Sequence, residues 1–279
     1  MNLSVGHTPV ATHNSGESVP SELSPRPYLH PVRTLAGTEV TETLPADHRH
    51  HLGVSVTLAD VSGTSFWGGR TFTREHGSVM LDNHGRQTHL SWADHAPDRT
   101  TELLSWTDRE GTELLREERT LRALPLDATT WVLDLRSSLR NTSGRELGIG
   151  SPATNGRPGA GYGGVFWRAP IGDRPPSVTG PDGMSGEDAL HGSSARWLAL
   201  ASTASHDSPW TLLFLRTGPR TDPWFLRARE YPGVCPAPAW NTRQVLPAGQ
   251  TLELGLRTAV TDGSVTDHEA LANAVAALV

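Results

Sequence analysis

Residues 45–53, PADHRHHLG, place three histidines within four positions. An imidazole with a pKa of about 6.5 exchanges protons near neutral pH when a carboxylate orients it. Alternate side chains of an extended segment share a face, so we expect His48 and His50 to point together and His51 to point the opposite way. Two imidazoles two positions apart are also a common half-site for a divalent metal. A structural turn, whose histidines hydrogen-bond to the backbone, is the third interpretation.

A metal site would need a third ligand from elsewhere, and His30, His76 and His191 are the histidine candidates. The cupin spacing places a glutamate three or four residues after the HxH pair, where this chain has Gly53 and Val54. The cupin type of metal site is therefore excluded. We predict no cofactor, with a divalent metal as the alternative.

Proton transfer on a sugar ring needs a base at the anomeric hydroxyl and an acid at the ring oxygen. Asp47 or Asp60 would orient a histidine, and Glu187 or Glu230 would serve as the base. The segment EDALHG, residues 187–192, also supplies His191 close to a glycine-rich stretch. A solvated surface turn is the alternative interpretation of this segment.

The glycine-rich stretch GAGYGGVFWRAP, residues 159–170, has the composition of a ligand-binding segment, because glycine lets the backbone approach a ligand closely. Tyr162 and Trp167 would stack on the apolar face of a sugar, and Arg168 would bind hydroxyls or a carboxylate. A sheet crossing with core aromatic residues explains the same pattern. Two further tryptophans are predicted to face a ligand, Trp67 and Trp224.

The charge balance excludes several classes of function. The chain has 24 basic residues, all of them arginine, against 30 acidic ones, and it has no basic run, which argues against nucleic acid as a partner. Without lysine it forms no Schiff base through its own side chains. No apolar stretch approaches the roughly 20 residues of a membrane helix, so we expect a soluble, cytoplasmic protein that does not enter membranes. Its predicted partner is a small molecule, and the oligomeric state is left open.

Strand patterns recur along the chain, and 28 glycines and 21 prolines suit an all-β domain with many turns. In residues 100–124, two arms flank DREG, which predicts a hairpin, with a helix over 113–122 as the competitor. Residues 129–141 alternate cleanly. Further strands are expected at 38–44, at 53–61, and in the runs ARWLALAST, WTLLFLRT, PWFLRARE and QTLELGLRTAV.

The ends of the chain differ from its middle. Residues 1–25 are rich in Ser, Pro, Thr and Gly and are predicted to be a disordered leader. Residues 26–279 are predicted to form one domain, a large antiparallel β-sandwich with long irregular binding loops over 150–186. A C-terminal helix is expected at 266–278, with Thr266 and Glu269 as its capping box.

Five stretches together resemble a known family: RPYLHPVRTLAGTEVT, DHRHHLG followed by ADVSGTSFW, GRPGAGYGGVFWRAP, HGSSARWLAL and LPAGQTLELGLRTAVTDG. In this order they are similar to the family that is labelled methane oxygenase PmoA and treated as a domain of unknown function. The resemblance covers roughly residues 26–271. The PmoA subunit itself spans membranes, and this chain has no candidate span, so the label implies no methane chemistry here.

The resemblance implies carbohydrate chemistry, because relatives accompany sugar-handling oxidoreductases and isomerases. The β-rich pattern is also compatible with the galactose-mutarotase-like supersandwich. Many relatives carry a basic residue where this chain has Leu52, which implies a difference in substrate or activity.

The expected function is therefore acid–base catalysis on a sugar or sugar-derived substrate, of the epimerisation or elimination type. A metal-dependent enzyme that uses the same histidines and a non-catalytic carbohydrate-binding module are the alternatives. The predicted catalytic residues are His48, His50, His51, His191 and Glu187. The predicted substrate-binding residues are Arg168, Tyr162, Trp167, Trp67 and Trp224.

Overall fold

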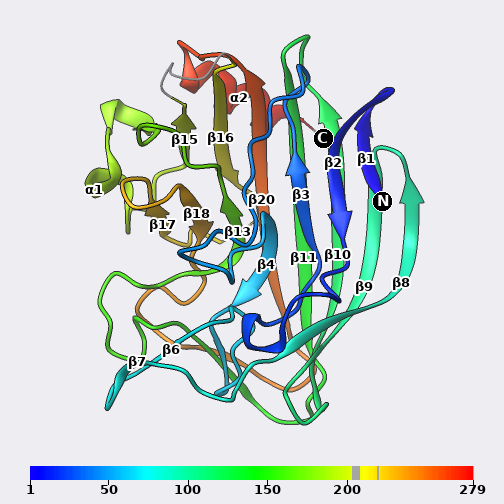
Figure 1. Cartoon of the computed structure of the whole chain (residues 1–279), viewed down its shortest axis with the longest axis vertical. Helices are drawn as coiled ribbons and strands as arrows, with labels where there is room; N and C mark the ends of the chain where they lie inside the picture. Colours follow the sequence, from blue (N-terminus) through cyan, green and yellow to red (C-terminus); the bar gives the residue numbers. More distant parts are fainter. Residues whose placement is uncertain (203–207, 219, 279) are drawn as a thin grey trace.

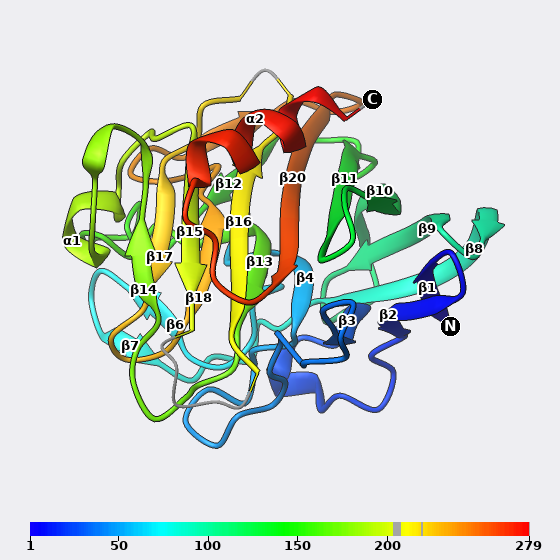
Figure 2. The same cartoon turned by 90° about the horizontal axis from the view of Figure 1, so that it is seen from above.

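Two large sheets lie face to face in the computed structural model, which describes residues 1–202, 208–218 and 220–278 (Figures 1 and 2). One has seven strands in the order β1-β2-β3-β4-β13-β18-β17, and the other has eight in the order β14-β15-β16-β20-β11-β10-β9-β8. The first sheet contains β1 (Asn2–Val5), β2 (Thr8–Asn14), β3 (Tyr28–Val32), β4 (Val54–Leu58), β13 (Gly163–Arg168), β17 (Trp224–Arg227) and β18 (Gly233–Pro236). The second contains β8 (Arg86–Ala96), β9 (Arg99–Thr107), β10 (Glu113–Pro125), β11 (Thr130–Asn141), β14 (Ser177–Thr179), β15 (Trp197–Ala201), β16 (Trp210–Arg216) and β20 (Thr251–Asp262).

Smaller elements complete the described chain. A three-stranded sheet joins β19 (Gln244–Leu246), β12 (Leu147–Gly150) and β5 (Asp60–Val61), and a two-stranded one joins β6 (Thr71–Thr73) and β7 (Gly77–Val79). The helices are η1 (Ser21–Leu23), η2 (Pro181–Gly183), α1 (Glu187–Leu190) and α2 (His268–Ala277). In the described residues, no helix has the length and apolar character to cross a membrane. The predicted antiparallel β-sandwich with a C-terminal helix is confirmed.

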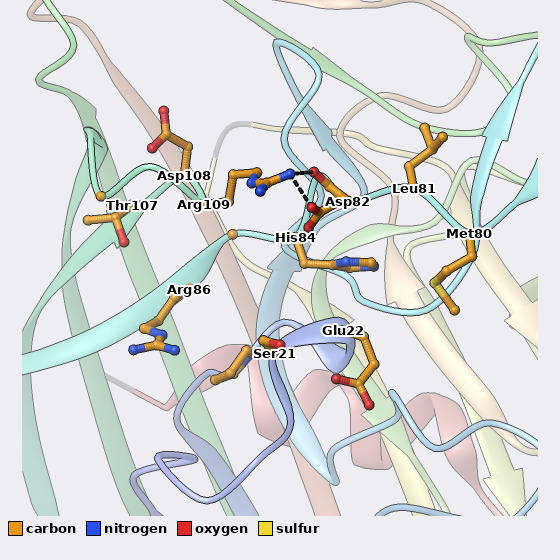
Figure 3. A pocket seen from close by; sticks show the side chains of 13 residues that line it. Ser21, Glu22, Met80, Leu81, Asp82, His84, Arg86, Thr107, Asp108 and Arg109 are labelled. Atoms are coloured by element: carbon orange, nitrogen blue, oxygen red, sulfur yellow. Dashed lines mark hydrogen bonds and ion pairs between the residues drawn. The ribbon is translucent and has the colours of Figure 1, made fainter.

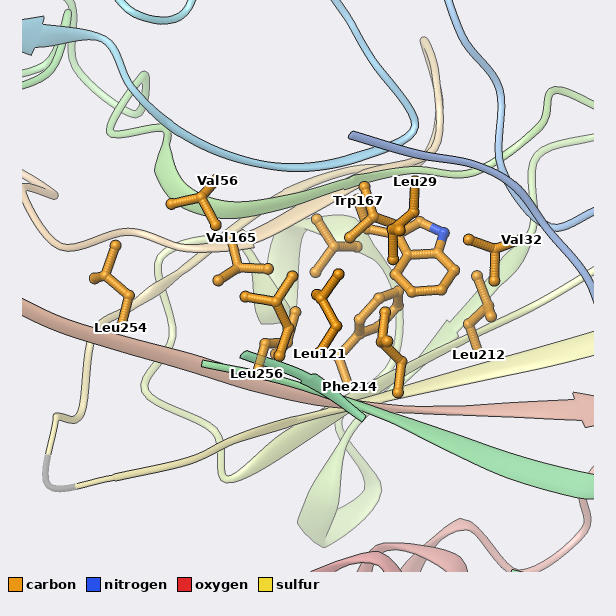
Figure 4. Packing of buried hydrophobic residues seen from close by; sticks show 14 of the residues in the cluster. Leu29, Val32, Val56, Leu121, Val165, Trp167, Leu212, Phe214, Leu254 and Leu256 are labelled. Atoms are coloured by element: carbon orange, nitrogen blue, oxygen red, sulfur yellow. The ribbon is translucent and has the colours of Figure 1, made fainter. Parts of the chain in front are cut away.

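The main core lies between the two sheets and follows from the two-residue period of the strands. In β13, Val165 and Trp167 enter this core, whereas Phe166 and Arg168 point to the outer face of the seven-stranded sheet. Figure 4 shows the facing layers, with core residues of both sheets in contact. The labelled ones are Leu29, Val32, Val56, Leu121, Val165, Trp167, Leu212, Phe214, Leu254 and Leu256.

The hairpin predicted from residues 100–124 is confirmed as β9 and β10. Asp108 donates its amide to the carbonyl of Thr112, which closes the DREG turn at 3.0 Å. The helix alternative for 113–122 is wrong, because burial follows the two-residue period of a strand: Glu117 and Arg119 are buried, whereas Glu118 between them is exposed. The tertiary pairing with β9 and β11 outweighs the helix propensity of this Glu- and Leu-rich run.

The prediction of a disordered leader over residues 1–25 is wrong. Residues 2–5 and 8–14 form the strands β1 and β2, which pair with each other, and β2 pairs with β3. Leu3 and Val10 are fully buried in the main core. The sequence did not predict these strands because their composition is mostly polar, and only a few apolar side chains anchor them in the core.

A buried carboxylate also ties the N-terminal strands to the other sheet. Glu102 of β9 is fully buried and accepts from His13 of β2 at 3.0 Å and from His89 of β8 at 2.7 Å. Burial by itself raises the pKa of Glu102, but the His13 hydrogen bond and the nearby Arg119 charge outweigh burial and hold the pKa below its usual value.

Two of the expected strands are modified. Residues 38–44 form only isolated bridges at Glu39 and Thr43. The Val32 amide donates to the Thr41 hydroxyl, so it is not available for a backbone hydrogen bond to a paired strand. The strand expected at 53–61 is divided into β4 and β5. The long segment 150–186 contains β13 and β14 and is irregular elsewhere.

The C-terminal helix α2 is capped by a different residue from the one predicted. Asp267 accepts the amide of Ala270 at 2.8 Å, so Thr266 lies outside the cap. The helix packs on the outer face of the eight-stranded sheet, where its buried residues are Ala272 and Val275 (Figure 2). Ala274, between these two buried residues, is exposed.

Candidate functional site

The outer face of the seven-stranded sheet carries a layer of aromatic side chains. Phe166 and Phe225 stand on β13 and β17, and Trp67, Tyr162 and Tyr231 reach over them from loops. Trp67 lies 4.4 Å from Tyr162 and 4.9 Å from Phe166, and Tyr162 lies 5.3 Å from Phe225, between ring centres. We call these five residues the aromatic face. Such rings pack closely on one another: four of the five are buried, and Tyr162 alone among them is partly exposed.

The three histidines of residues 45–53 gather at the Tyr231 end of the aromatic face. The His48 amide donates to Pro45 O and the His51 amide to His48 O, so this segment forms consecutive turns. The His48 and His51 rings stack at 4.7 Å, and the His50 ring lies 4.6 Å from His51. The predicted extended geometry, with His51 opposite the other two, is therefore wrong. The histidine cluster is the set His48, His50 and His51.

Arg168 lies beneath the histidine cluster and is fully buried. Its guanidinium donates to Glu42 Oε2 at 2.9 and 3.1 Å and to His51 Nδ1 at 3.4 Å. It also lies 4.7 Å from the centre of the Tyr231 ring, as a cation–π contact. Because arginine only donates, His51 Nδ1 acts as an acceptor. Arg168 thus fixes both the tautomer and the position of His51.

Two members of the cluster are neutral at pH 7. Burial, together with the charges of Arg26 and His48, lowers the pKa of His50 to about 3. Burial and the neighbouring histidines hold the pKa of His51 well below its ordinary value. Neutral imidazoles keep one acceptor and one donor nitrogen each, which suits recognition of hydroxyl groups.

His48 differs from its neighbours because it is partly exposed and has a carboxylate partner. Its Nδ1 donates to Asp47 Oδ2 at 2.8 Å, and one-third of its side chain is accessible. Burial raises the pKa of Asp47, but the hydrogen bonds from His48 and the backbone, together with the nearby His48 and Arg168 charges, outweigh burial and lower the pKa overall. His48 Nε2 has no hydrogen-bond partner in the described chain. An imidazole oriented in this way can exchange a proton with a ligand.

Arg26 joins the segments that carry the cluster, and sequence reasoning missed it. It is fully buried and donates to His50 O at 2.7 Å, Trp67 O at 3.2 Å and Ser55 Oγ at 3.2 Å. Burial and the charge of Arg119 lower its pKa to about 9, so it remains a cation at pH 7. No local motif marks Arg26, because its partners come from distant parts of the chain.

Glu42 and Tyr231 were also missed. Glu42 belongs to a run expected as a strand, and its role as the partner of Arg168 depends on a contact 126 residues apart in sequence. Tyr231 stands in REYPG beside proline and glycine. Trp67 and Trp224, which were selected from the sequence, also stand beside glycine or proline, so the same signal could have found Tyr231.

His191 and Glu187 lie at the Phe225 end of the aromatic face, away from the histidine cluster. His191 Nδ1 accepts the Leu226 amide at 3.2 Å, and its ring lies 5.5 Å from Phe225. Burial and the charge of Arg227 lower its pKa. Glu187 accepts the amides of residues 228 and 229 at 2.8 and 3.0 Å. These contacts fasten α1 to β17 and the residues that follow it.

Trp167 and Trp224 point away from the aromatic face. Both are fully buried in the main core, and their indole nitrogens donate to Val40 O and Ala195 O. Their assignment as ligand platforms is therefore corrected, because they occupy the inward positions of β13 and β17. Leu52 is likewise buried, against Val19 and Leu23. It anchors the histidine turn from behind and does not face the cluster.

The remaining candidate ligands are dispersed. Within the described ranges, no group of three or more His, Cys, Asp or Glu side chains is arranged to hold a metal ion. Asp60 pairs with Arg243, and His76 lies exposed between β6 and β7. Cys235 is buried beneath the aromatic face, and burial raises its pKa to about 12, so it is no nucleophile.

Comparison with known proteins identifies the family through a match that begins at the first residue and extends over residues 1–276. The chain belongs to a family of unknown function, DUF6807. The match includes β1 and β2, so the N-terminal strands are part of the family's sequence pattern. The expected domain of unknown function is thereby confirmed, without support for the methane oxygenase label. No curated protein matches the chain.

Proposed function

We propose that this protein is an enzyme that transfers protons on a sugar or sugar-derived substrate bound over the aromatic face. The observation that carries the proposal is the Asp47–His48 pair, stacked on the neutral His51 ring and backed by Arg168. In this scheme Asp47 orients His48, and His48 Nε2 takes up or releases the proton. His50 supplies a neutral hydrogen-bonding group beside it.

Aromatic rings next to neutral hydrogen-bonding groups favour a carbohydrate. In this scheme the apolar C–H face of a sugar packs on Tyr162, the partly exposed ring of the aromatic face, while its hydroxyls both donate and accept. Burial raises the pKa of Tyr162 to about 12, so its phenol stays protonated and is a donor at pH 7.

The test is proton exchange in D2O, followed by 1H NMR on a panel of monosaccharides and disaccharides. We expect the protein to accelerate anomer interconversion or deuterium incorporation at carbon. His48→Asn should slow this at least about 100-fold, the usual contribution of an acid–base residue. His7→Asn, at an exposed histidine in the β1–β2 turn, should leave the rate unchanged.

Other outcomes point elsewhere. Binding of sugars without any exchange would reject catalysis and favour the carbohydrate-binding module. Exchange that is equally fast in His48→Asn would reject the assigned residue. Exchange that disappears with a chelator and returns with Zn²⁺ or Mn²⁺ would favour the metal-dependent enzyme.

A further inference from the structure

A pocket of about 630 Å³ opens at the end of the sandwich where β8 starts and β9 turns into β10 (Figure 3). This volume lies in the range of small-molecule sites. Three segments line the pocket: residues 21–25, residues 80–86 and residues 107–111. None of its lining residues belongs to the aromatic face or the histidine cluster.

The charges in this pocket include one carboxylate and one guanidinium without any partner in the described residues. Arg109 forms an ion pair with Asp82, and Asp108 accepts the amide of Thr112. Glu22 and Arg86 are exposed, and their side chains have no hydrogen-bond or ion-pair partner within the described residues. A single anion or cation would satisfy only one of the two. Hydroxyl groups satisfy both, because each donates and accepts.

One wall of the pocket is apolar. Met80 is 55% and Leu81 is 36% exposed, and they are among the few large hydrophobic side chains left at the surface of the described chain. In Figure 3 they lie on the opposite side of the pocket from Arg86 and Thr107. A wall of apolar groups facing donors and acceptors matches a sugar ring, which has a C–H face and a hydroxyl rim.

Gly69 contacts residues of the pocket wall and of the histidine cluster. On the pocket side its amide donates to Glu22 O at 2.8 Å, and its carbonyl accepts from His84 Nε2 at 2.7 Å. On the other side, a Cβ placed on Gly69 would lie 2.9 Å from His50 Nδ1. The pocket wall and the nearest histidine of the cluster are therefore joined through contacts with one residue that has no side chain.

We propose that the pocket binds a second, neutral sugar unit of the same ligand whose reacting unit meets the histidine cluster. The substrate is then a disaccharide or a glycoside with a polar aglycone, and a free monosaccharide fills only part of the site. This inference rests on the proposed function, but it is tested by binding and needs no turnover.

The experiment measures dissociation constants by saturation-transfer NMR and calorimetry. The probes are lactose, maltose, cellobiose and sucrose, with glucose and galactose as monosaccharides. We expect at least one disaccharide to bind more tightly than its component monosaccharide. Arg86→Ala should weaken that disaccharide roughly tenfold or more, as the loss of a charged hydrogen-bond donor predicts, and leave the monosaccharide unchanged. Met80→Ser should act in the same direction.

The matched control is Arg140→Ala, which removes an exposed arginine from β11 on the eight-stranded sheet. The inference is overturned if no disaccharide binds more tightly than its monosaccharide, or if Arg86→Ala and Arg140→Ala behave alike. The His48→Asn variant separates the two proposals, since it should slow proton exchange at least about 100-fold and still bind the disaccharide. An absence of exchange with every sugar rejects the proposed reaction, whereas the pocket is judged by its binding constants alone.

Discussion

At the scale of single residues, the three clustered histidines differ because of what surrounds each ring. His48 is partly exposed and paired with Asp47, whereas His51 is buried between Arg168 and aromatic rings. His50 is held by its carbonyl, which accepts from Arg26. Adjacent positions in sequence therefore lie in different environments: one partly exposed imidazole with a carboxylate partner, and two neutral neighbours.

The pH dependence of stability tests this difference. The folded pKa of His50 is about 3, and its unfolded value is about 6.5, so between these values the unfolded state binds the extra proton. The free energy of unfolding is therefore unaffected by the protonation of this group above pH ~6.5. Below that pH it falls by about 1.4 kcal/mol per pH unit, because the unfolded state gains the proton first. His50→Asn should flatten this slope in urea unfolding between pH 7 and pH 4. His7→Asn should keep it, and equal slopes in wild type and His50→Asn would contradict the low pKa.

Residue types alone predicted much of the candidate site. The segments containing the histidine cluster, Arg168, Tyr162 and Trp67 were selected from sequence, and the structure brings these side chains to one face of one sheet. Trp167 and Trp224 were misplaced because the sequence of these short strands does not show which alternate side chains face the core and which face outward. Arg26 and Glu42 were missed because their partners are far away in sequence.

At the scale of elements, the buried Glu102 carboxylate links β2 to the β8–β9 hairpin, and a substitution of Glu102 tests how much this link stabilises the protein. Glu102→Gln replaces an acceptor of two imidazole hydrogen bonds by a group with one acceptor oxygen inside the protein. We expect a loss of about 2 kcal/mol in the free energy of unfolding. Hydrogen exchange should show faster amide exchange in β2, which depends on this contact.

The control for that variant lies on the same hairpin. Asp94→Asn breaks the exposed ion pair with Arg99 and should leave both the free energy of unfolding and the β2 amides unchanged. If Glu102→Gln lowers the free energy of unfolding no more than Asp94→Asn does, or leaves the protection of the β2 amides intact, then the carboxylate does not hold the two sheets together at this edge.

The start of α2 gives a second prediction at this scale. Asp267→Ala removes the side chain that accepts the Ala270 amide and should cost about 1 kcal/mol of stability. Thr266→Ala, at the neighbouring position favoured by the sequence motif, should have little effect. Chemical denaturation of the two variants decides between them, and the opposite order would restore Thr266 as the cap.

Sequence patterns predicted the existence of the long elements better than their ends. The strands β9, β10, β11 and β20 have many alternating residues, so tertiary pairing only confirms the local signal. Residues 38–44 alternate equally well but find no continuous partner strand, and they form isolated bridges instead. Pairing partners, which decide this difference, are not encoded within the segment itself.

At the scale of the whole molecule, the first fourteen residues are part of the sandwich. Deleting residues 2–14 removes β1 and β2, withdraws Leu3 and Val10 from the core and leaves Glu102 without His13. We expect the midpoint of thermal unfolding to fall by roughly 10 °C or more, with aggregation as β3 becomes an edge. Circular dichroism measures this. A truncated protein that melts within about 2 °C of wild type would restore the leader hypothesis.

Close backbone contacts next to residues 45–53 also limit which substitutions this sequence tolerates. A methyl group at Gly53 would meet Leu29 O at 2.1 Å, and one at Gly68 would meet Leu23 O at 2.3 Å. Both glycines have positive φ angles, so no other residue fits easily. Selection that maintains the histidine cluster must therefore also act on these glycines, although they have no side chain that could take part in binding or chemistry. Among distant homologues, the spacing of these glycines should identify the site even where individual histidines have been exchanged.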